Sequence, residues 1–152
     1  MKVLCIIPAR SGSKNIKDKN LKKINNQSLI ELAISFSKKL KFINKTIFSS
    51  DSKKYIKIAS KFKIDVSLRP SKYSKDNSKV IDLIKYEINR QKKLFLKTYD
   101  FVLLLQPTSP FRNVKDFIRA YKFLKQRKAD SVLTLSEVPS HPERMMVKKK
   151  SY

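Results

Sequence analysis

Short apolar runs alternate along this chain with longer segments in which apolar residues recur every three or four positions. Short continuous apolar runs are typical of strands that are buried on both faces of a sheet. We therefore expect strands at five places: Val3–Ile7, Thr46–Ser49, Asp65–Leu68, Phe101–Leu105 and Ser131–Leu135.

The segments between these runs have helical periodicity. In the first helix Leu29, Ala33, Phe36 and Leu40 share one face, and Ser28 is placed to cap its N-terminus. Apolar positions mark three further helices: Ile56, Ala59 and Phe62 after Asp51 or Ser52; Val80, Ile84, Ile88 and Phe95; and Val114, Phe117, Ile118, Tyr121 and Leu124. Strands alternating with helices predict an α/β fold, a mostly parallel sheet with helices on both faces. At 152 residues we expect a single domain.

Parallel sheets of this kind bind ligands beyond the carboxyl ends of their strands. For this chain that rule selects three loops, 8–20, 49–52 and 106–112. We expect the chemistry of the protein to lie there.

The loop after the first strand contains Gly12, the one glycine of the chain. A dinucleotide fingerprint requires three glycines and a Walker loop two, so neither motif is present. The short turn of small residues could instead hold phosphates with its backbone N–H groups, and Arg10, Lys14 and Lys19 surround it. A polar loop with scattered lysines explains the same residues equally well.

The loop after Phe101–Leu105 is made rigid by Pro107 and Pro110. Its first residue, Gln106, can donate and accept hydrogen bonds, which suits a sugar hydroxyl or an amide. The alternative is a packed loop in which Thr108 or Ser109 serves as a turn residue. Residue types alone do not decide between the two.

The formal net charge is +24, which raises the question of nucleic-acid binding. Lysines outnumber arginines heavily, however, and they are spread over every expected helix. Nucleic-acid recognition favours arginine for its bidentate geometry. We therefore expect a solvated lysine-rich surface and no specific nucleic-acid partner, although a basic nucleic-acid-binding module remains an alternative.

Other classes of site have little support in the sequence. Cys5 lies inside an expected strand without a disulfide partner, and His141 has no second ligand at zinc spacing. No apolar run approaches the ~18 residues of a membrane span. We expect a cytoplasmic protein without a membrane partner.

Several segments together resemble the acylneuraminate cytidylyltransferases, or CMP-sialic acid synthetases. Ile7–Lys14 with Lys19–Leu21 resembles the first motif of the family, and Leu104–Arg112 resembles its Leu-Gln-Pro-Thr-Ser-Pro-Leu-Arg hallmark. Further matches follow in the same order as in the family: Ser49–Asp51, Leu68–Pro70, Ala129–Val132 and His141–Pro142. The resemblance covers essentially the whole chain and implies a Rossmann-like fold of the nucleotide-diphospho-sugar transferase type.

This resemblance implies transfer of CMP from CTP to the anomeric hydroxyl of a nonulosonic acid, with release of pyrophosphate and with Mg²⁺. By the same resemblance, Arg10 and Lys19 hold the triphosphate as catalytic cations, and the turn Ser11, Gly12, Ser13 and Lys14 wraps it. Asn20, Arg69 and Ser78 contact the nucleoside, and Gln106 contacts the sugar.

Members of the family continue beyond the His-Pro segment into a dimerisation insert and a strand with a metal-binding Asp pair. We therefore expect residues 1–152 to be an N-terminal part, inactive alone, from a protein that is a homodimer at full length. The metal ligands stay unassigned. A CMP-Kdo synthetase is the alternative enzyme, but those enzymes resemble Gly-Asp where this chain has Gln106.

Overall fold

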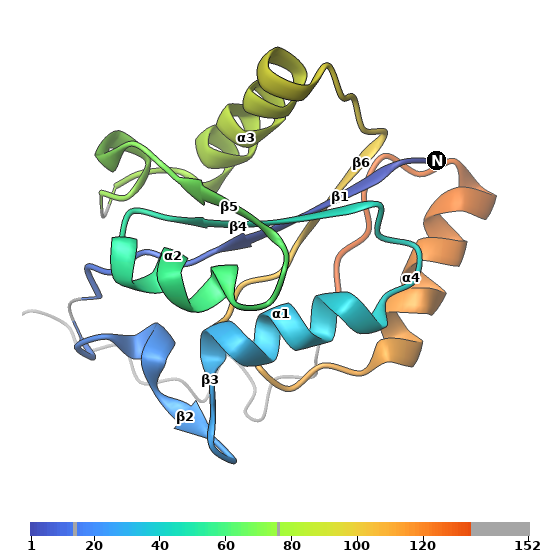
Figure 1. The fold of residues 1–152 in the computed structure, drawn as a ribbon. Helices are drawn as coiled ribbons and strands as arrows, with labels where there is room; N and C mark the ends of the chain where they lie inside the picture. The colour runs from blue at the N-terminus through green and yellow to red at the C-terminus, as the bar shows by residue number, and fades with distance from the viewer. Residues whose placement is uncertain (14, 76, 135–152) are drawn as a thin grey trace, which may run out of the picture. The chain divides into compact units, whose positions relative to one another are not determined.

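The computed structural model describes residues 1–13, 15–75 and 77–134 (Figure 1). Its internal contacts divide the chain into two units, Met1–Val114 and Lys115–Tyr152. The first unit contains the sheet and three helices, and the described part of the second is mostly α4 (Val114–Arg127). The expectation of one domain stays a prediction.

A parallel sheet forms the centre of the first unit. Its strands are β1 (Val3–Pro8), β4 (Lys45–Ser50), β5 (Asp65–Leu68) and β6 (Phe101–Leu104), in the order β5-β4-β1-β6. Every pairing is parallel, and β1 lies between β4 and β6. All four strands were predicted, and the parallel α/β architecture is confirmed.

Helices cover both faces of this sheet. α1 (Leu29–Lys39) and α2 (Lys53–Ser60) lie on one face and α3 (Val80–Phe95) on the other (Figure 1). Alternate residues of β1 point to opposite faces, so the face of Leu4 and Ile6 meets Ile84 of α3. The continuous apolar run of β1 is thus explained by burial on both sides.

The sequence between β1 and α1 folds into small elements that the periodicity did not predict. Lys19–Leu21 is a 3-10 helix, η1, and β2 (Lys23–Ile24) pairs with β3 (Gln27–Ser28) as a hairpin. Asn25 and Asn26 both have left-handed φ angles of 46° and 63°. Tight hairpins need positive φ at both turn residues, and asparagine tolerates it.

Ser28 also begins α1, as predicted. Its hydroxyl accepts a hydrogen bond from the Glu31 backbone N–H, and the Glu31 carboxylate accepts one from the Ser28 N–H. This reciprocal capping box satisfies donors that the first turn of a helix otherwise leaves unpaired.

The strand predicted at Ser131–Leu135 is wrong for residues 131–134, which are in no strand; Leu135 lies outside the described residues. A strand needs a partner to pair its backbone groups. Leu133 is 83% exposed, so its apolar side chain is not buried either. The short apolar run there did not suffice to define a strand.

Cys5 is a buried free thiol, as expected for a small apolar residue in β1. Its burial raises the pKa of the thiol to about 12. Within the described residues, no helix is both long and apolar enough to traverse a bilayer.

Candidate functional site

A cavity of about 270 Å³ opens beyond the carboxyl ends of the strands in the first unit. Three parts of the chain line it: the loop after β1, the segment between β5 and α3, and the loop after β6. The lining residues are Pro8, Arg10, Ser13, Lys19, Asn20, Arg69, Tyr73, Lys75, Ser78, Lys79, Val80, Leu83, Gln106, Pro107 and Thr108. Two of the three loops selected from the sequence thus contribute to one cavity.

Three cations predicted from the sequence meet in this cavity: Arg10 and Lys19 from the loop after β1, and Arg69 from the segment after β5. Arg69 is only 6% exposed, and its Nε donates to Ser74 Oγ at 2.8 Å. Burial lowers the pKa of its guanidinium, while the Asp51 and Glu87 carboxylates act in the opposite direction. A fixed arginine beside two further cations gives the cavity a positive lining that is suited to an anion.

Asn20 is a buried residue of the cavity lining. Its Nδ2 donates to the Arg10 carbonyl oxygen at 3.0 Å, which ties η1 back to the end of β1. Its Oδ1 is buried and has no hydrogen-bond partner. Because buried polar atoms are nearly always paired, this acceptor is suited to a donor on a bound ligand.

The loop after β1 is held at two points by the corner between β4 and α2. Asp51 accepts from the Ser11 N–H at 3.0 Å and from the Ser11 hydroxyl at 2.9 Å. Farther along, Asp18 accepts from the buried Tyr55 hydroxyl at 2.9 Å and from Lys54 Nζ at 3.2 Å. These bonds lower the pKa of the Asp18 carboxyl, Tyr55 contributing most.

The loop after β6 presents Gln106 at the cavity. Its backbone carbonyl accepts hydrogen bonds from the Arg112 guanidinium and from the Ser109 N–H. The side chain is exposed and contributes to the cavity lining. Gln106 is therefore held by its backbone while its amide is accessible from the cavity.

Of the ten predicted site residues, seven line the cavity: Arg10, Ser13, Lys19, Asn20, Arg69, Ser78 and Gln106. Ser11 and Gly12 are not among its lining residues, and Lys14 lies outside the described residues. Ser78 donates its hydroxyl to the Lys72 carbonyl oxygen at 2.8 Å. No ligand tests these roles, so they stay predictions.

Sequence reasoning missed the contributions of Tyr73, Lys75, Lys79 and Thr108 to the cavity wall. The two lysines flank Ser78 in the segment between β5 and α3, and that proximity was a usable signal. The loop 49–52, which was expected at the ligand, does not line the cavity; Asp51 contacts Ser11 instead.

Magnesium prefers oxygen ligands and usually binds one or two carboxylates together with substrate phosphates. The cavity lining just described contains no carboxylate, and both Asp51 oxygens already accept from Ser11. In the part of the chain that the structure describes, no group of three or more His, Cys, Asp or Glu residues could hold a metal ion. The residues of this cavity therefore do not fit a Mg²⁺ ion held by protein ligands.

Residues 4–149 match the family model described as Cytidylyltransferase, so the chain belongs to the cytidylyltransferase family. It is 32% identical over 142 residues to the N-acylneuraminate cytidylyltransferase of Escherichia coli O18:K1:H7, covering 91% of this chain and 33% of that protein. It is also 32% identical over 148 residues to the CMP-N,N'-diacetyllegionaminic acid synthase of Legionella pneumophila, covering 93% and 61%. The resemblance found in the sequence motifs is thus confirmed.

The fold is similar to that of a CMP:2-keto-3-deoxy-manno-octonic acid synthetase solved in complex with CTP. The TM-score is 0.69 at 17% identity, over 85% of this chain and 49% of that one. At this identity the likeness shows the shared nucleotidyltransferase fold alone. The chain spans between about a third and three-fifths of the length of the relatives named above.

Proposed function

We propose that the cavity of the first unit binds CTP, and that the chain supplies the nucleotide site of an enzyme transferring CMP to a nonulosonic acid. The observation that carries the proposal is the convergence of Arg10, Lys19 and Arg69 on one cavity. A nucleoside triphosphate brings several negative charges, and cations fixed by the fold are suited to hold them.

In the proposed reaction the anomeric hydroxyl oxygen of the sugar attacks the α-phosphorus of CTP. The bond from that phosphorus to the bridging oxygen breaks, pyrophosphate leaves with the electron pair, and the hydroxyl proton is released. Negative charge therefore grows on the leaving group. Arg10 and Lys19 would stabilise that charge, because preorganised cations act most strongly where charge develops.

Other lining residues suit the remaining parts of the two substrates. The unpaired Oδ1 of Asn20 can accept a hydrogen bond from a ribose hydroxyl. Arg69 and Ser78 lie in the wall between β5 and α3, where we assign the nucleoside. Gln106 lies on the opposite loop, and we assign its amide to the sugar.

The acceptor class is supported by the relatives, which act on N-acylneuraminic and diacetyllegionaminic acids according to their names. A CMP-Kdo synthetase is the second candidate, since such an enzyme shares the fold. The sequence matches favour the nonulosonic acids. A requirement for Mg²⁺ and a homodimeric assembly belong to the same proposal, to be checked by magnesium titration and light scattering.

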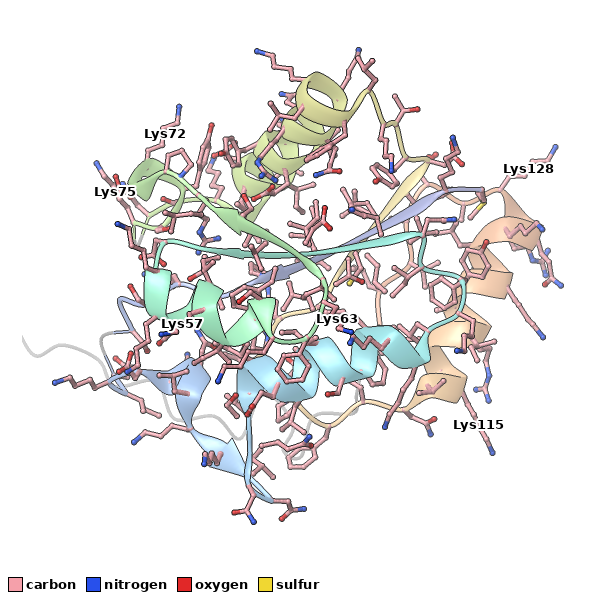
Figure 2. The ribbon with its side chains drawn as sticks, in the orientation of Figure 1. Lys57, Lys63, Lys72, Lys75, Lys115 and Lys128 are labelled. Atoms are coloured by element: carbon pink, nitrogen blue, oxygen red, sulfur yellow. The ribbon has the colours of Figure 1, made fainter. Side chains whose placement is uncertain are left out.

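The test is calorimetric titration of the chain with CTP, comparing wild type with Arg10→Ala. A hydrogen bond to a charged group contributes about 1.5–3 kcal/mol, so losing it should raise Kd about tenfold or more. Lys57→Ala is the matched control, because Lys57 is an exposed cation of α2 that does not line the cavity (Figure 2).

Cytidine should bind Arg10→Ala and wild type equally, because it lacks the triphosphate. Equal CTP affinity in the two proteins would remove Arg10 from the site. If Lys57→Ala weakened CTP binding as much as Arg10→Ala does, the effect would come from overall charge. The assignment of CTP to this cavity would then be wrong.

A further inference from the structure

Asp51 is a carboxylate that contacts the loop after β1, the loop proposed to hold the triphosphate. Like charges repel each other, so an anion beside the phosphates opposes binding. Asp51 avoids this position: it does not line the cavity, and both of its oxygens accept from Ser11. It contacts the loop after β1 at Ser11, which is not a lining residue either.

The contact fixes the backbone of the loop as well as a side chain. Asp51 Oδ1 accepts from the Ser11 N–H at 3.0 Å and Oδ2 from the Ser11 hydroxyl at 2.9 Å. Ser11 lies directly between Arg10, which lines the cavity, and Gly12, which is exposed. Two bonds to one residue restrict both the position and the rotation of this turn.

The same corner of the fold holds the other end of the loop. Asp51 directly follows β4, and α2 begins two residues later with Ser52 as its N-cap. From α2 the buried Tyr55 donates its hydroxyl to Asp18, the residue before Lys19. Arg10 and Lys19 are thus each adjacent in sequence to a residue anchored by this corner.

We infer that Asp51 is a positioning residue: it holds Ser11, and thereby Arg10 and the turn after it, in the geometry that receives the triphosphate. The inference rests on the proposed nucleotide function for its consequence, but the contact itself can be tested without nucleotide. It also assigns the Ser11 donors to Asp51 and not to the triphosphate.

The alternative role for Asp51 is that of a metal ligand or of a charge that the site requires. Two substitutions separate these roles. Asparagine keeps one acceptor for the Ser11 N–H and gains an N–H₂ donor that the Ser11 hydroxyl can accept, so Asp51→Asn preserves the contact without the charge. Asp51→Ala removes both.

We expect Asp51→Ala to raise the Kd for CTP about tenfold, with Mg²⁺ and equally in EDTA, while Asp51→Asn stays within about threefold of wild type. Ser11→Ala should weaken binding in the same way, and the double variant Ser11→Ala/Asp51→Ala should be no weaker than Asp51→Ala. Asp65→Asn is the control, because Asp65 pairs with Lys45 at the amino ends of their strands.

A second measurement uses the single glycine of the chain. Glycine amides resonate apart from most others in a ¹H–¹⁵N correlation spectrum, so Gly12 reports on the loop in the absence of nucleotide. Its cross-peak should move in Asp51→Ala and in Ser11→Ala and stay in place in Asp65→Asn.

The inference is overturned if Asp51→Asn binds CTP as weakly as Asp51→Ala, or if the loss occurs only with Mg²⁺. An unmoved Gly12 peak in Asp51→Ala overturns it as well. If wild type itself does not bind CTP, the proposed function fails for this chain, and the Gly12 peak still decides whether Asp51 holds the loop.

Discussion

Arg69 shows how single residues of the cavity combine burial with charge. An arginine taken out of water is stable only when its donors and its charge are matched. The Ser74 hydroxyl accepts a hydrogen bond from Arg69 Nε, and the Asp51 and Glu87 carboxylates favour the charged form of the guanidinium. The guanidinium is therefore a buried cation held in one place, whereas the lysines labelled in Figure 2 are exposed.

Gly12 permits a residue-scale prediction. Its φ is not in the left-handed region, and a Cβ added there would meet nothing within 4 Å. Gly12 does not line the cavity, but the family resemblance predicts that its turn wraps the triphosphate. We therefore expect Gly12→Ala to fold with an unchanged Tm but to bind CTP more weakly, because a methyl group there would hinder the close approach of the triphosphate to the backbone. Thermal unfolding and calorimetric titration check the two halves.

The neighbouring residue Ala9 offers a control in which the substitution changes stability. Its side chain is buried, so Ala9→Gly should lower the Tm. If Gly12→Ala bound CTP like wild type, the turn would not wrap the phosphates, and the assignment of Gly12 would be wrong.

The site residues that could be predicted are those carried by local motifs. Arg10, Lys19 and Asn20 lie in the loop after β1, and Gln106 lies in the loop after β6, so strand position and residue type were informative. The bond between Ser11 and Asp51 joins residues 40 positions apart. Only the register of β1 against β4 brings these two together, and a sequence pattern does not contain it.

At the scale of the elements, α3 shows what periodicity predicts and what it leaves open. The apolar positions Val80, Ile84, Ile88 and Phe95 correctly predicted a helix, and Ile84 packs against the core, but the other three are exposed. The buried face carries Leu83, Glu87 and Gln91 instead. Glu87 accepts from the buried Ser49 hydroxyl at 2.6 Å, so a polar contact with β4 lies where an apolar one was expected.

The capping box of α1 permits a prediction about pH. Hydrogen bonds from Ser28 lower the pKa of the Glu31 carboxyl below its unfolded value of about 4.3. A lowered folded-state pKa means that the contribution to stability is present above the unfolded pKa and lost as pH falls through the folded pKa. Glu31→Ala should lower the free energy of unfolding by about 1 kcal/mol at neutral pH.

Glu31→Gln is the matched variant, since glutamine also completes a capping box but does not titrate. The difference in unfolding free energy between wild type and Glu31→Gln, measured in urea, should shrink or reverse from neutral pH to about pH 3. A difference independent of pH would show that the Glu31 charge plays no part in the cap.

At the scale of the whole chain the question is where the +24 charge resides. Lys57 on α2, Lys63 just after it, and Lys72 and Lys75 in the segment between β5 and α3 are all exposed on the first unit (Figure 2). This dispersal is what the sequence predicted. One hollow of about 730 Å³ nevertheless collects cations; it is lined by Lys72, Tyr73, Ser78, Asp82, Lys85, Tyr86, Asn89, Arg90, Lys93 and Leu94.

This hollow has two features of a single-strand binding surface. The rings of Tyr73 and Tyr86 lie 4.8 Å apart between centroids, and four cations, Lys72, Lys85, Arg90 and Lys93, surround them. Other features oppose that function: Asp82 lines the same hollow, and Arg90 is 3.9 Å from the buried Glu87 carboxylate. We therefore expect weak binding that does not depend on sequence.

The prediction is quantitative because each phosphate contact to a single strand contributes about 0.7 to the slope of log affinity against log salt. Four contacts give a slope of about −3, so affinity for a labelled oligonucleotide should fall about fiftyfold between about 50 mM and 200 mM salt.

Fluorescence anisotropy measures this affinity, and two oligonucleotides of unrelated sequence are expected to bind alike. Lys85→Ala should flatten the slope by about 0.7, and Lys57→Ala should not. A tight complex that distinguishes the two sequences at about 150 mM salt would instead make nucleic acid a specific partner of this protein.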